Sequence, residues 1–401
     1  MTLKEKRRID QLRHGIVPEG YKRTKVGICP EDWVENVLGD IYTERKEPGN
    51  EGLPLLMVSI HSGVSDGEVG EKDLPKRFKR IEDKSQYKRA VVGDLVFNMM
   101  RAWQGAIGSV RTEGMVSPAY VVAKPNDMVD PLFMDYYMKT NRMVHTIHRQ
   151  SYGVTDFRLR LYWESFAPIP CVLPPAREQK KIAEILSAQD KVIELEQQEI
   201  AEIMKVKRFF LEKMFPKKGK TVPEIRFKGF AGPWEQRKLG DVVDVRSGKD
   251  YKHLPEGNIP VYGTGGYLLS VNQALSYNED AIGIGRKGTI DKPYILKAPF
   301  WTVDTLFYAV PSQNSDLDFV FDIFQNIDWK KKDESTGVPS LSKTAINEID
   351  ISAPCLEEQQ VIGSYFSKID DLITLHQRKL EEEKKKKKAL MQLLLTGIVR
   401  V

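Results

Sequence analysis

The stretch PPAREQKKIAEILSAQDKVI at positions 174–193 returns in altered form as PCLEEQQVIGSYFSKIDDLI at positions 354–373. A Glu-Gln pair occupies the fifth and sixth positions of each copy, and the apolar positions coincide at a constant offset of 180. Self-similarity at a fixed offset is typical of repeated architectures. The match therefore predicts that one structural unit occurs twice in the chain.

Two shorter motifs recur in the same order around this stretch. Trp33 is followed five residues later by Leu-Gly-Asp, and Trp234 is followed by the same tripeptide at the same spacing. The sequence SYGV (151–154) has a counterpart in STGV (335–338). Three matches in one order indicate a tandem duplication, in which a globular unit and a long helix are followed by a second unit and a second helix.

Both copies of the opening stretch begin long helical runs. The run from Arg177 to Met214 contains neither Gly nor Pro, and Pro216 follows it. Its apolar residues recur at helical spacing, as do those from Leu356 to Leu395. At 1.5 Å per residue each helix is about 55–60 Å long. A two-fold relation between the halves predicts an antiparallel, coiled-coil-like pair. The alternative, in which each helix packs only on its own domain, stays open.

The segments between the helices predict mixed α/β units. Apolar runs favour strands within 89–103, 115–125, 280–286 and 300–311, and helical spacing favours short helices within 130–147 and 315–327. The fold class is therefore α/β (mixed) globular units plus two long α-helices. The predicted boundaries are an N-terminal segment 1–30, a first domain 31–175, a central helix 176–215, a second domain 216–354 and a C-terminal helix 355–401.

The segment DAIGIGRKGTID (280–291) contains Gly283, Gly285 and Gly288 in the spacing G-x-G-x-x-G. A dinucleotide-binding fingerprint needs a helix directly after the glycines. Here a β-rich segment broken by prolines follows, so we expect a tight turn that exposes Arg286 and Lys287. The chain shows no phosphate-binding loop, no nucleophile triad and no segment for amino-group methylation. We therefore expect no catalytic residue, no bound cofactor and no metal ligand in this chain.

Composition limits the class of protein further. The 401 residues include 61 basic and 56 acidic residues, a net charge of +5 that permits nucleic-acid binding without demonstrating it. Three widely spaced cysteines argue for a reducing compartment. No apolar run approaches the length needed to cross a membrane, and the charged N-terminus lacks the apolar core of a secretory signal. We expect a cytoplasmic protein with no membrane partner.

These landmarks together resemble the specificity subunit of type I restriction–modification enzymes. The resemblance covers nearly the whole chain. It is strongest in FPKKGKTVPEIRFKGFAGPWEQRKLGD (215–241), in the Glu-Gln openings of both helices and in the closing KKKALMQLLLTGIVRV (386–401).

The resemblance implies a non-catalytic DNA-reading subunit. Two target-recognition domains would each read half of a bipartite sequence in double-stranded DNA, and two antiparallel helices would separate them. Two methyltransferase subunits would dock on the helices and methylate adenine N6 with S-adenosylmethionine. Two motor-nuclease subunits would use ATP and Mg²⁺ to move and cut DNA. Because the two domains differ in sequence, we expect an asymmetric target.

The resemblance assigns no particular contact residues, so the candidates rest on side-chain chemistry. Arg and Gln can make paired hydrogen bonds to guanine and adenine edges, whereas Lys mostly holds phosphates. The DNA-binding candidates are Asn98, Arg101, Trp103, Gln104 and Tyr152 in the first unit, and Arg246, Lys249, Tyr262, Arg286, Lys287 and Lys343 in the second. The partner-binding candidates on the helices are Ile182, Ile193, Ile203, Ile362, Ile373 and Leu390.

Two other functions compete with DNA recognition. A self-sufficient methyltransferase or nuclease would bind S-adenosylmethionine itself, and the absent motifs argue against it. A coiled-coil scaffold with two protein-binding heads would have no role on DNA; DNA affinity of the purified complex that ignored sequence and hardly responded to salt would favour it.

Overall fold

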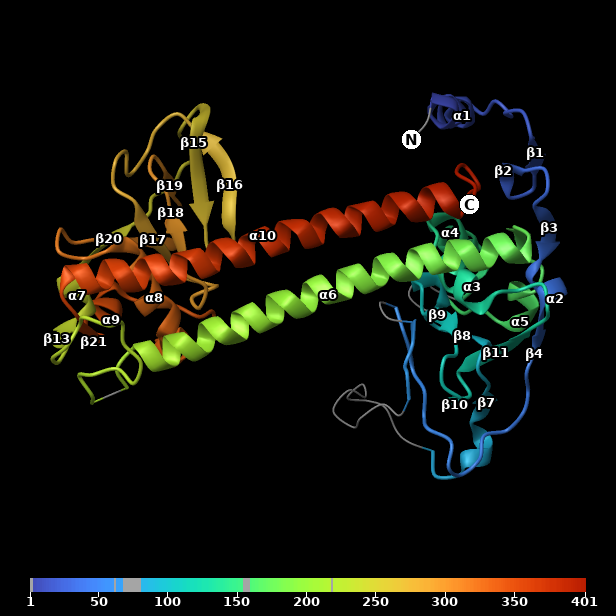
Figure 1. Cartoon of the computed structure of the whole chain (residues 1–401), viewed down its shortest axis with the longest axis horizontal. Helices are drawn as coiled ribbons and strands as arrows, with labels where there is room; N and C mark the ends of the chain where they lie inside the picture. Colours follow the sequence, from blue (N-terminus) through green and yellow to red (C-terminus); the bar gives the residue numbers. More distant parts are fainter. Residues whose placement is uncertain (1–2, 61–62, 68–80, 154–158, 218) are drawn as a thin grey trace. The chain divides into compact units, whose positions relative to one another are not determined.

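The structure is a computed structural model that describes residues 3–60, 63–67, 81–153, 159–217 and 219–401 (Figure 1). Val154 of the SYGV motif lies outside the described residues. The chain forms two units, one of residues 1–195 with 381–401 and the other of residues 196–380. Each unit therefore contains part of each long helix, α6 (Ala176–Met214) and α10 (Leu356–Leu394). This division differs from the predicted boundaries, which treated each helix as a separate segment.

The first unit surrounds a four-stranded antiparallel sheet of order β4-β11-β8-β9. Successive residues of a strand face opposite sides of the sheet. Phe97 therefore packs in the hydrophobic cluster that includes the helices, and its neighbour Val96 packs in a second hydrophobic cluster with Val58. The bounds of its helices, in addition to the long pair, are α1 (Leu3–Arg13), α2 (Leu38–Ile41), η2 (Lys84–Gln86), η3 (Ala102–Gln104), α3 (Pro131–Met138), α4 (Asn141–Gln150) and α5 (Trp163–Phe166). Its strands are β1 (Tyr21–Thr24), β2 (Gly27–Pro30), β3 (Val34–Val37), β4 (Tyr42–Glu44), β5 (Val58–Ser59), β6 (Gly63–Val64), β7 (Lys88–Ala90), β8 (Leu95–Asn98), β9 (Ile107–Ser109), β10 (Gly114–Val116), β11 (Tyr120–Pro125) and β12 (Pro170–Leu173).

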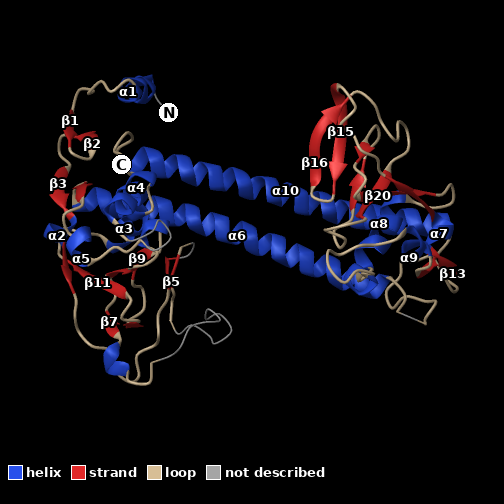
Figure 2. Ribbon diagram, turned by 180° about the vertical axis from the view of Figure 1, so that it is seen from behind, coloured by secondary structure: helices blue, strands red, loops and turns tan. Residues whose placement is uncertain are grey.

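The second unit repeats this plan with the sheet order β14-β20-β17-β18, and Figure 2 shows the strands of both units in red. Phe307 and Ile284 pack from the sheet against Phe319 of α8 and Phe366 of α10. Its helices are α7 (Leu239–Val242), α8 (Leu317–Asn326), η4 (Trp329–Lys332) and α9 (Lys343–Asn347). Its strands are β13 (Glu235–Lys238), β14 (Val243–Ser247), β15 (Glu256–Gly263), β16 (Gly266–Val271), β17 (Ala281–Gly285), β18 (Tyr294–Leu296), β19 (Trp301–Thr302), β20 (Leu306–Pro311) and β21 (Asp350–Ala353).

Within each unit the two long helices run antiparallel and are joined by a partly buried ion pair. In the second unit Lys207 Nζ lies 2.6 Å from both carboxylate oxygens of Asp370. In the first unit Lys387 pairs with Asp190. Each lysine and each aspartate is 180 residues from its counterpart, so the two ion pairs are the same contact repeated. The predicted antiparallel helix pair is confirmed, and each helix also packs on the core of its unit.

The neighbours of these two ion pairs differ. In the first unit the hydroxyl of Tyr136 donates a 2.8 Å hydrogen bond to Asp190. The corresponding residue of α8 is Asp322, which is buried beside Lys207, and burial raises the pKa of its carboxyl group. The shared frame thus carries different chemistry in the two units.

The repeated Glu-Gln pair has a structural role in both units. Gln179 Oε1 accepts the N–H of Asp130, which caps α3, and Gln359 Oε1 accepts the N–H of Asp316, which caps α8. Each glutamine therefore attaches the start of a long helix to the start of a short one. A glutamine side chain can both donate and accept hydrogen bonds, and this explains why glutamine occupies the position in both units.

The glutamate of each pair binds an arginine from the segment that follows the opposite long helix. Glu358 accepts two 2.7 Å hydrogen bonds from Arg226. Glu178 accepts bonds from Arg400 and a 3.1 Å bond from the indole N–H of Trp33. The indole N–H of Trp234, the counterpart of Trp33, has no hydrogen-bond partner among the described residues. Arg226 is therefore the main partner of a deeply buried carboxylate.

Replacing Arg226 with alanine is expected to lower the free energy of unfolding by about 3 kcal/mol, because Glu358 stays buried without its counter-charge. The matched change Arg400→Ala should cost less, since Glu178 keeps the hydrogen bond from Trp33. Denaturant unfolding followed by tryptophan fluorescence measures both losses. Equal losses in the two variants would contradict this explanation of the pair.

Candidate nucleic-acid interface

The first-unit candidates gather at the loop that follows β8. Asn98 ends the strand and its side chain accepts the N–H of Met100, which shapes the turn. Arg101 and Gln104 are exposed. Trp103 is half-buried: its indole donates to the carbonyl of Met100, and its ring meets the His148 ring edge-on at 5.5 Å. The loop thus presents the guanidinium of Arg101 and the side-chain amide of Gln104 to solvent, while the hydrogen bonds of Asn98 and Trp103 hold its backbone.

Tyr152 belongs to a returning segment that lies beside this loop. The N–H of Leu161 donates to the carbonyl of Met99 at 2.8 Å, which joins the segment to the end of β8. Tyr152 is 58% exposed, and its ring lies 5.4 Å from that of Tyr162. All five first-unit candidates therefore come from two joined segments.

The second-unit glycine segment occupies the same position in its own unit. Gly283 and Gly285 lie in β17, the counterpart of β8, and the strand β18 follows them rather than a helix. A side chain at Gly285 would come within 2.0 Å of the Thr289 carbonyl oxygen, and Gly288 has a φ of +98°. The glycines therefore shape a tight turn, and Arg286 and Lys287 in it are exposed.

Arg286, Lys287 and Lys343 lie together. The guanidinium of Arg286 and the ammonium of Lys343 lie 5.8 and 6.0 Å from the centre of the Phe307 ring. The backbones of Lys287 and Ser340 form an isolated antiparallel β-bridge, and the N–H of Leu341 donates to the carbonyl of Arg286 at 2.9 Å. This last bond repeats the bond from Leu161 to Met99. In both units the returning segment thus lies beside the loop that follows the equivalent strand.

The remaining second-unit candidates have different surroundings. Lys249 is exposed, and its N–H donates to the carbonyl of Thr302. Tyr262 is half-buried between the rings of Tyr267 and Tyr294, where it helps to pack the β15–β16 ribbon. It is therefore a poorer candidate for contact with a ligand than its exposed neighbour Tyr267.

Arg246 does not join the cluster around Arg286. Its guanidinium bonds to Glu279 and Asp244 at 2.6 and 2.7 Å. Hydrogen bonds to Glu279 and Asp244 raise the pKa of the guanidinium. Since two carboxylates already balance its charge, Arg246 is better suited to hold β14 than to contact DNA.

The comparisons with known proteins agree with this duplicated plan. The family model described as the type I restriction modification DNA specificity domain matches residues 120–205 and 232–384. The chain belongs to this family. The first match ends within α6 and the second within α10, so each includes the start of a long helix.

Relatives and solved structures of this family match the present chain over nearly its full length. The type I restriction enzyme MjaVIII specificity subunit of Methanocaldococcus jannaschii is 25% identical over 96% of each chain. The S subunit of a type I restriction–modification system from M. genitalium aligns with a TM-score of 0.58 and 16% identity, covering 91% of this chain and 96% of its own. A chain solved in work on complex assembly and conformational transition of the type I R-M system aligns with a TM-score of 0.55 and 16% identity, covering 92% and 99%.

The structure corrects the partner-binding prediction at two positions. Ile182 and Ile362 are 0% and 2% exposed and belong to the cores of their own units, so neither side chain is available to a partner. Ile193, Ile203, Ile373 and Leu390 are half-buried. The large apolar side chains that α6 and α10 do expose are Val192, Leu195, Met204, Val206, Phe209, Val361, Leu372 and Leu375.

Sequence reasoning also missed several exposed residues near the candidate loops. Tyr267 on β16 is 62% exposed, and no local pattern in the sequence distinguished it from its neighbour Leu268, which is also exposed. The exposed Arg160 and the half-buried Tyr162 accompany Tyr152 in the first unit, where Arg160 donates to the hydroxyl of Tyr162 at 3.3 Å.

The described residues contain no group of three or more His, Cys, Asp or Glu side chains arranged to hold a metal ion. Nor does any helix within the described ranges combine the length and apolar character required to cross a bilayer.

Proposed function

We propose that this chain reads a bipartite, asymmetric sequence in double-stranded DNA, one half through each unit, for a type I restriction–modification complex. Membership of the specificity-domain family supports DNA recognition. The observation that carries the two-part reading is the pair of equivalent loops after β8 and β17, each beside its returning segment. The two loops carry different side chains, which favours two different half-sites.

The chemistry of the loops suits base and phosphate contacts. Arg101, Gln104 and Arg286 can each make paired hydrogen bonds to base edges in the major groove. Lys287 and Lys343 suit phosphates, which fix the position of a protein on DNA without reading its sequence. Of the second-unit candidates, Arg246 contributes least, because its charge is already balanced.

Catalysis in this proposal belongs to partner subunits. Two methyltransferase subunits would dock on exposed apolar residues of the long helices, such as Leu195, Phe209 and Leu375, and would bind S-adenosylmethionine. Two motor-nuclease subunits would bind ATP and Mg²⁺. The chain itself would bind no cofactor. Since its substrate is the host's own DNA and incoming DNA, we propose that it acts in the cytoplasm.

The test is methylation mapping of the host genome with the gene intact and deleted. Loss of adenine methylation at one asymmetric, two-part motif on deletion is the expected result, and it would also supply the target sequence. A palindromic motif would contradict the assignment of one half-site to each unit. DNA binding by the purified complex that ignored sequence and salt would favour the scaffold alternative instead.

A further inference from the structure

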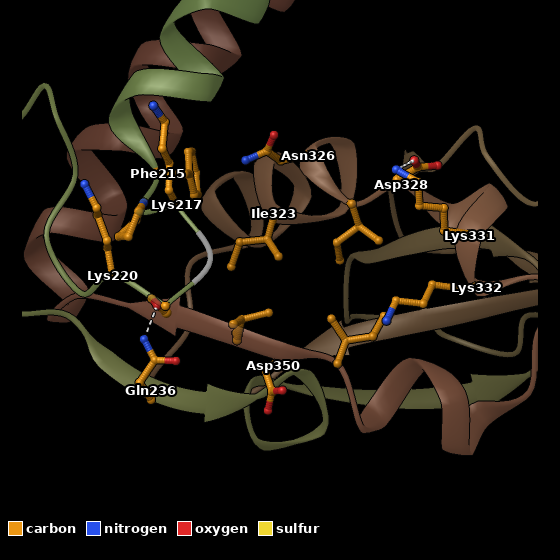
Figure 3. Close-up of a pocket in the computed structure, with 16 residues that line it drawn as sticks. Phe215, Lys217, Lys220, Gln236, Ile323, Asn326, Asp328, Lys331, Lys332 and Asp350 are labelled. Carbon is orange, nitrogen blue, oxygen red and sulfur yellow. Dashed lines mark hydrogen bonds and ion pairs between the residues drawn. The ribbon is translucent and has the colours of Figure 1, made fainter.

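A groove of about 460 Å³ lies in the second unit beside the end of α6. Apolar side chains of Phe215, Ile323, Ile327, Ile349 and Ile351 line it. In Figure 3, Ile323 lies in the middle of the groove, between side chains from the chain that follows α6 and side chains from the end of α8 and η4. None of the DNA-binding candidates lines this groove.

Lysines border the groove on both sides. Lys217 and Lys220 lie on one side of Ile323, and Lys331 and Lys332 lie on the other (Figure 3). Lys217 pairs with Glu224 and Lys331 with Asp328. Lys220 and Lys332 make no ion pair with any residue that the structure describes. Four lysines against Asp328, Asp350 and the Glu224 that pairs with Lys217 leave the border with a net positive charge.

The first unit shows how the equivalent space is filled from within the chain. There a smaller cavity of about 220 Å³ is lined by Tyr137, Val172 and Leu395, the counterparts of Ile323, Ser352 and Phe215. The counterparts follow from position: Tyr137 and Ile323 each lie seven residues after the aspartate that caps their helix. The β1–β2 hairpin borders this cavity and buries Val26 in the core of the unit.

The second unit lacks this hairpin. Trp33 lies fifteen positions after Pro18, whereas Trp234 lies only eleven positions after Pro223. The shorter segment forms no strand between 223 and 234. No strand of residues 223–234 therefore takes the place of the hairpin that borders the first unit's cavity.

The groove also contains the outer edge of strand β21. The N–H of Leu239 donates to the carbonyl of Ile349, and this bond shows which residue pairs of β13 and β21 are hydrogen-bonded to each other and which are not. Since bonded and non-bonded pairs alternate, the N–H of Ser352 points away from β13. In the first unit the equivalent N–H, that of Val172, donates to the hydroxyl of Tyr137 at 3.1 Å. In the second unit isoleucine replaces this tyrosine and offers no acceptor.

We propose that this groove binds an extended acidic segment of a partner protein. The segment adds to the edge of β21 and accepts the N–H of Ser352, as in other cases of strand addition. An apolar residue at its centre occupies the space over Ile323 and Ile351, as Val26 does in the first unit. Acidic residues on either side reach Lys220 and Lys332.

A peptide fits this site better than DNA does. The floor is apolar, and five large side chains line it, whereas the DNA backbone offers only charge and sugar to such a surface. A free strand edge requires an acceptor with peptide spacing, which a phosphate chain does not provide. The lysines then determine the sign of the segment's charge, while the groove determines its extended form.

The test uses the full chain and a fluorescein-labelled seven-residue peptide with a Val-Ile-Val centre and two acidic residues at each end. Fluorescence anisotropy should give micromolar affinity, at least about ten-fold tighter than for the same centre flanked by lysines, a difference of 1.4 kcal/mol. Ile323→Tyr should weaken binding about ten-fold or more, because it restores the first unit's tyrosine at the strand edge. The double change Lys220→Glu and Lys332→Glu should do the same through charge.

Matched controls separate this site from general charge and folding effects. Lys46→Glu with Lys124→Glu makes the same charge change on exposed positions of the first unit and should leave peptide affinity unchanged. Far-ultraviolet circular dichroism checks that each variant is folded, and the charge variant keeps the test valid if Ile323→Tyr is not. Equal affinity for acidic and basic peptides, or binding unaffected by all groove variants, would overturn the proposal. So would a charge variant that lost affinity for duplex DNA and not for the peptide.

Discussion

Replacing Arg286, Lys287 and Lys343 together with alanine is expected to reduce methylation at the target of the assembled complex by more than 100-fold. The side chains of Arg286 and Lys343 lie beside the Phe307 ring, Lys287 is the next residue of the same exposed turn, and none of the three belongs to the hydrophobic core of the second unit. A paired base contact is worth about 1–3 kcal/mol, and each lost phosphate contact also weakens binding. The summed loss of about 4 kcal/mol or more corresponds to a factor of roughly a thousand.

The single variants should divide this loss by mechanism. Arg286→Ala should relax the base preference in one half-site, whereas Lys287→Ala should weaken binding to all sequences and reduce its salt dependence. Arg101→Ala with Gln104→Ala should affect the other half-site only. Methylation mapping and affinity measured at several salt concentrations distinguish these outcomes. A triple variant with unchanged target and rate would exclude the β17 loop from the interface.

The long helices were the most predictable part of the fold. Their apolar spacing persists over 39 residues in each case, and the observed bounds lie within one or two residues of the predicted runs. The helix expected over 130–147 instead breaks into α3 and α4, because Thr140 caps a new helix by accepting the N–H of Met143. The sequence carried that signal, a threonine before an asparagine, but the continuous apolar spacing concealed it.

The sequence could not show which apolar residues of the long helices lie in the unit cores and which stay accessible. Ile182 and Ile362 satisfy the same helical spacing as the half-buried Ile193 and Ile373, yet only the first pair lies in the unit cores. Only the folded units determine which part of a wide stripe they cover.

The outcome for the DNA-binding candidates has a similar cause. Arg286 and Lys287 could be singled out because glycines on either side predict a turn, and a turn exposes its side chains. Arg246 follows the alternation of an ordinary strand, but Glu279, which binds it, lies 33 residues later in the sequence. Contacts of that separation leave no local pattern. The sequence therefore identified the loop and could not identify the residue whose charge is already balanced.

Inserting one heptad into each long helix is expected to widen the spacer between the half-sites while leaving the bases of both half-sites unchanged. We propose that the helices set this spacing. The insertions belong between residues 195 and 196 and between residues 380 and 381, where the chain passes from one unit to the other. Seven residues add about 10 Å, or about three base pairs at 3.4 Å each. A heptad also keeps the apolar positions of the two helices in phase.

The added base pairs also rotate one half-site about the DNA axis, since a turn takes about 10 base pairs. We therefore expect slower methylation at the widened site than at the original one, but a clear preference for the new spacing over the old. A heptad in α6 alone is the control: it lengthens one helix between the Lys207–Asp370 and Lys387–Asp190 ion pairs but not the other, so the two ion pairs no longer fit one register and the protein should lose activity at both spacings. Altered half-site bases with an unaltered spacer would show that the helices do not set the distance. Spacing would then have to arise from the loops themselves, which the variants of Arg101 and Arg286 would reveal as changes in spacer length.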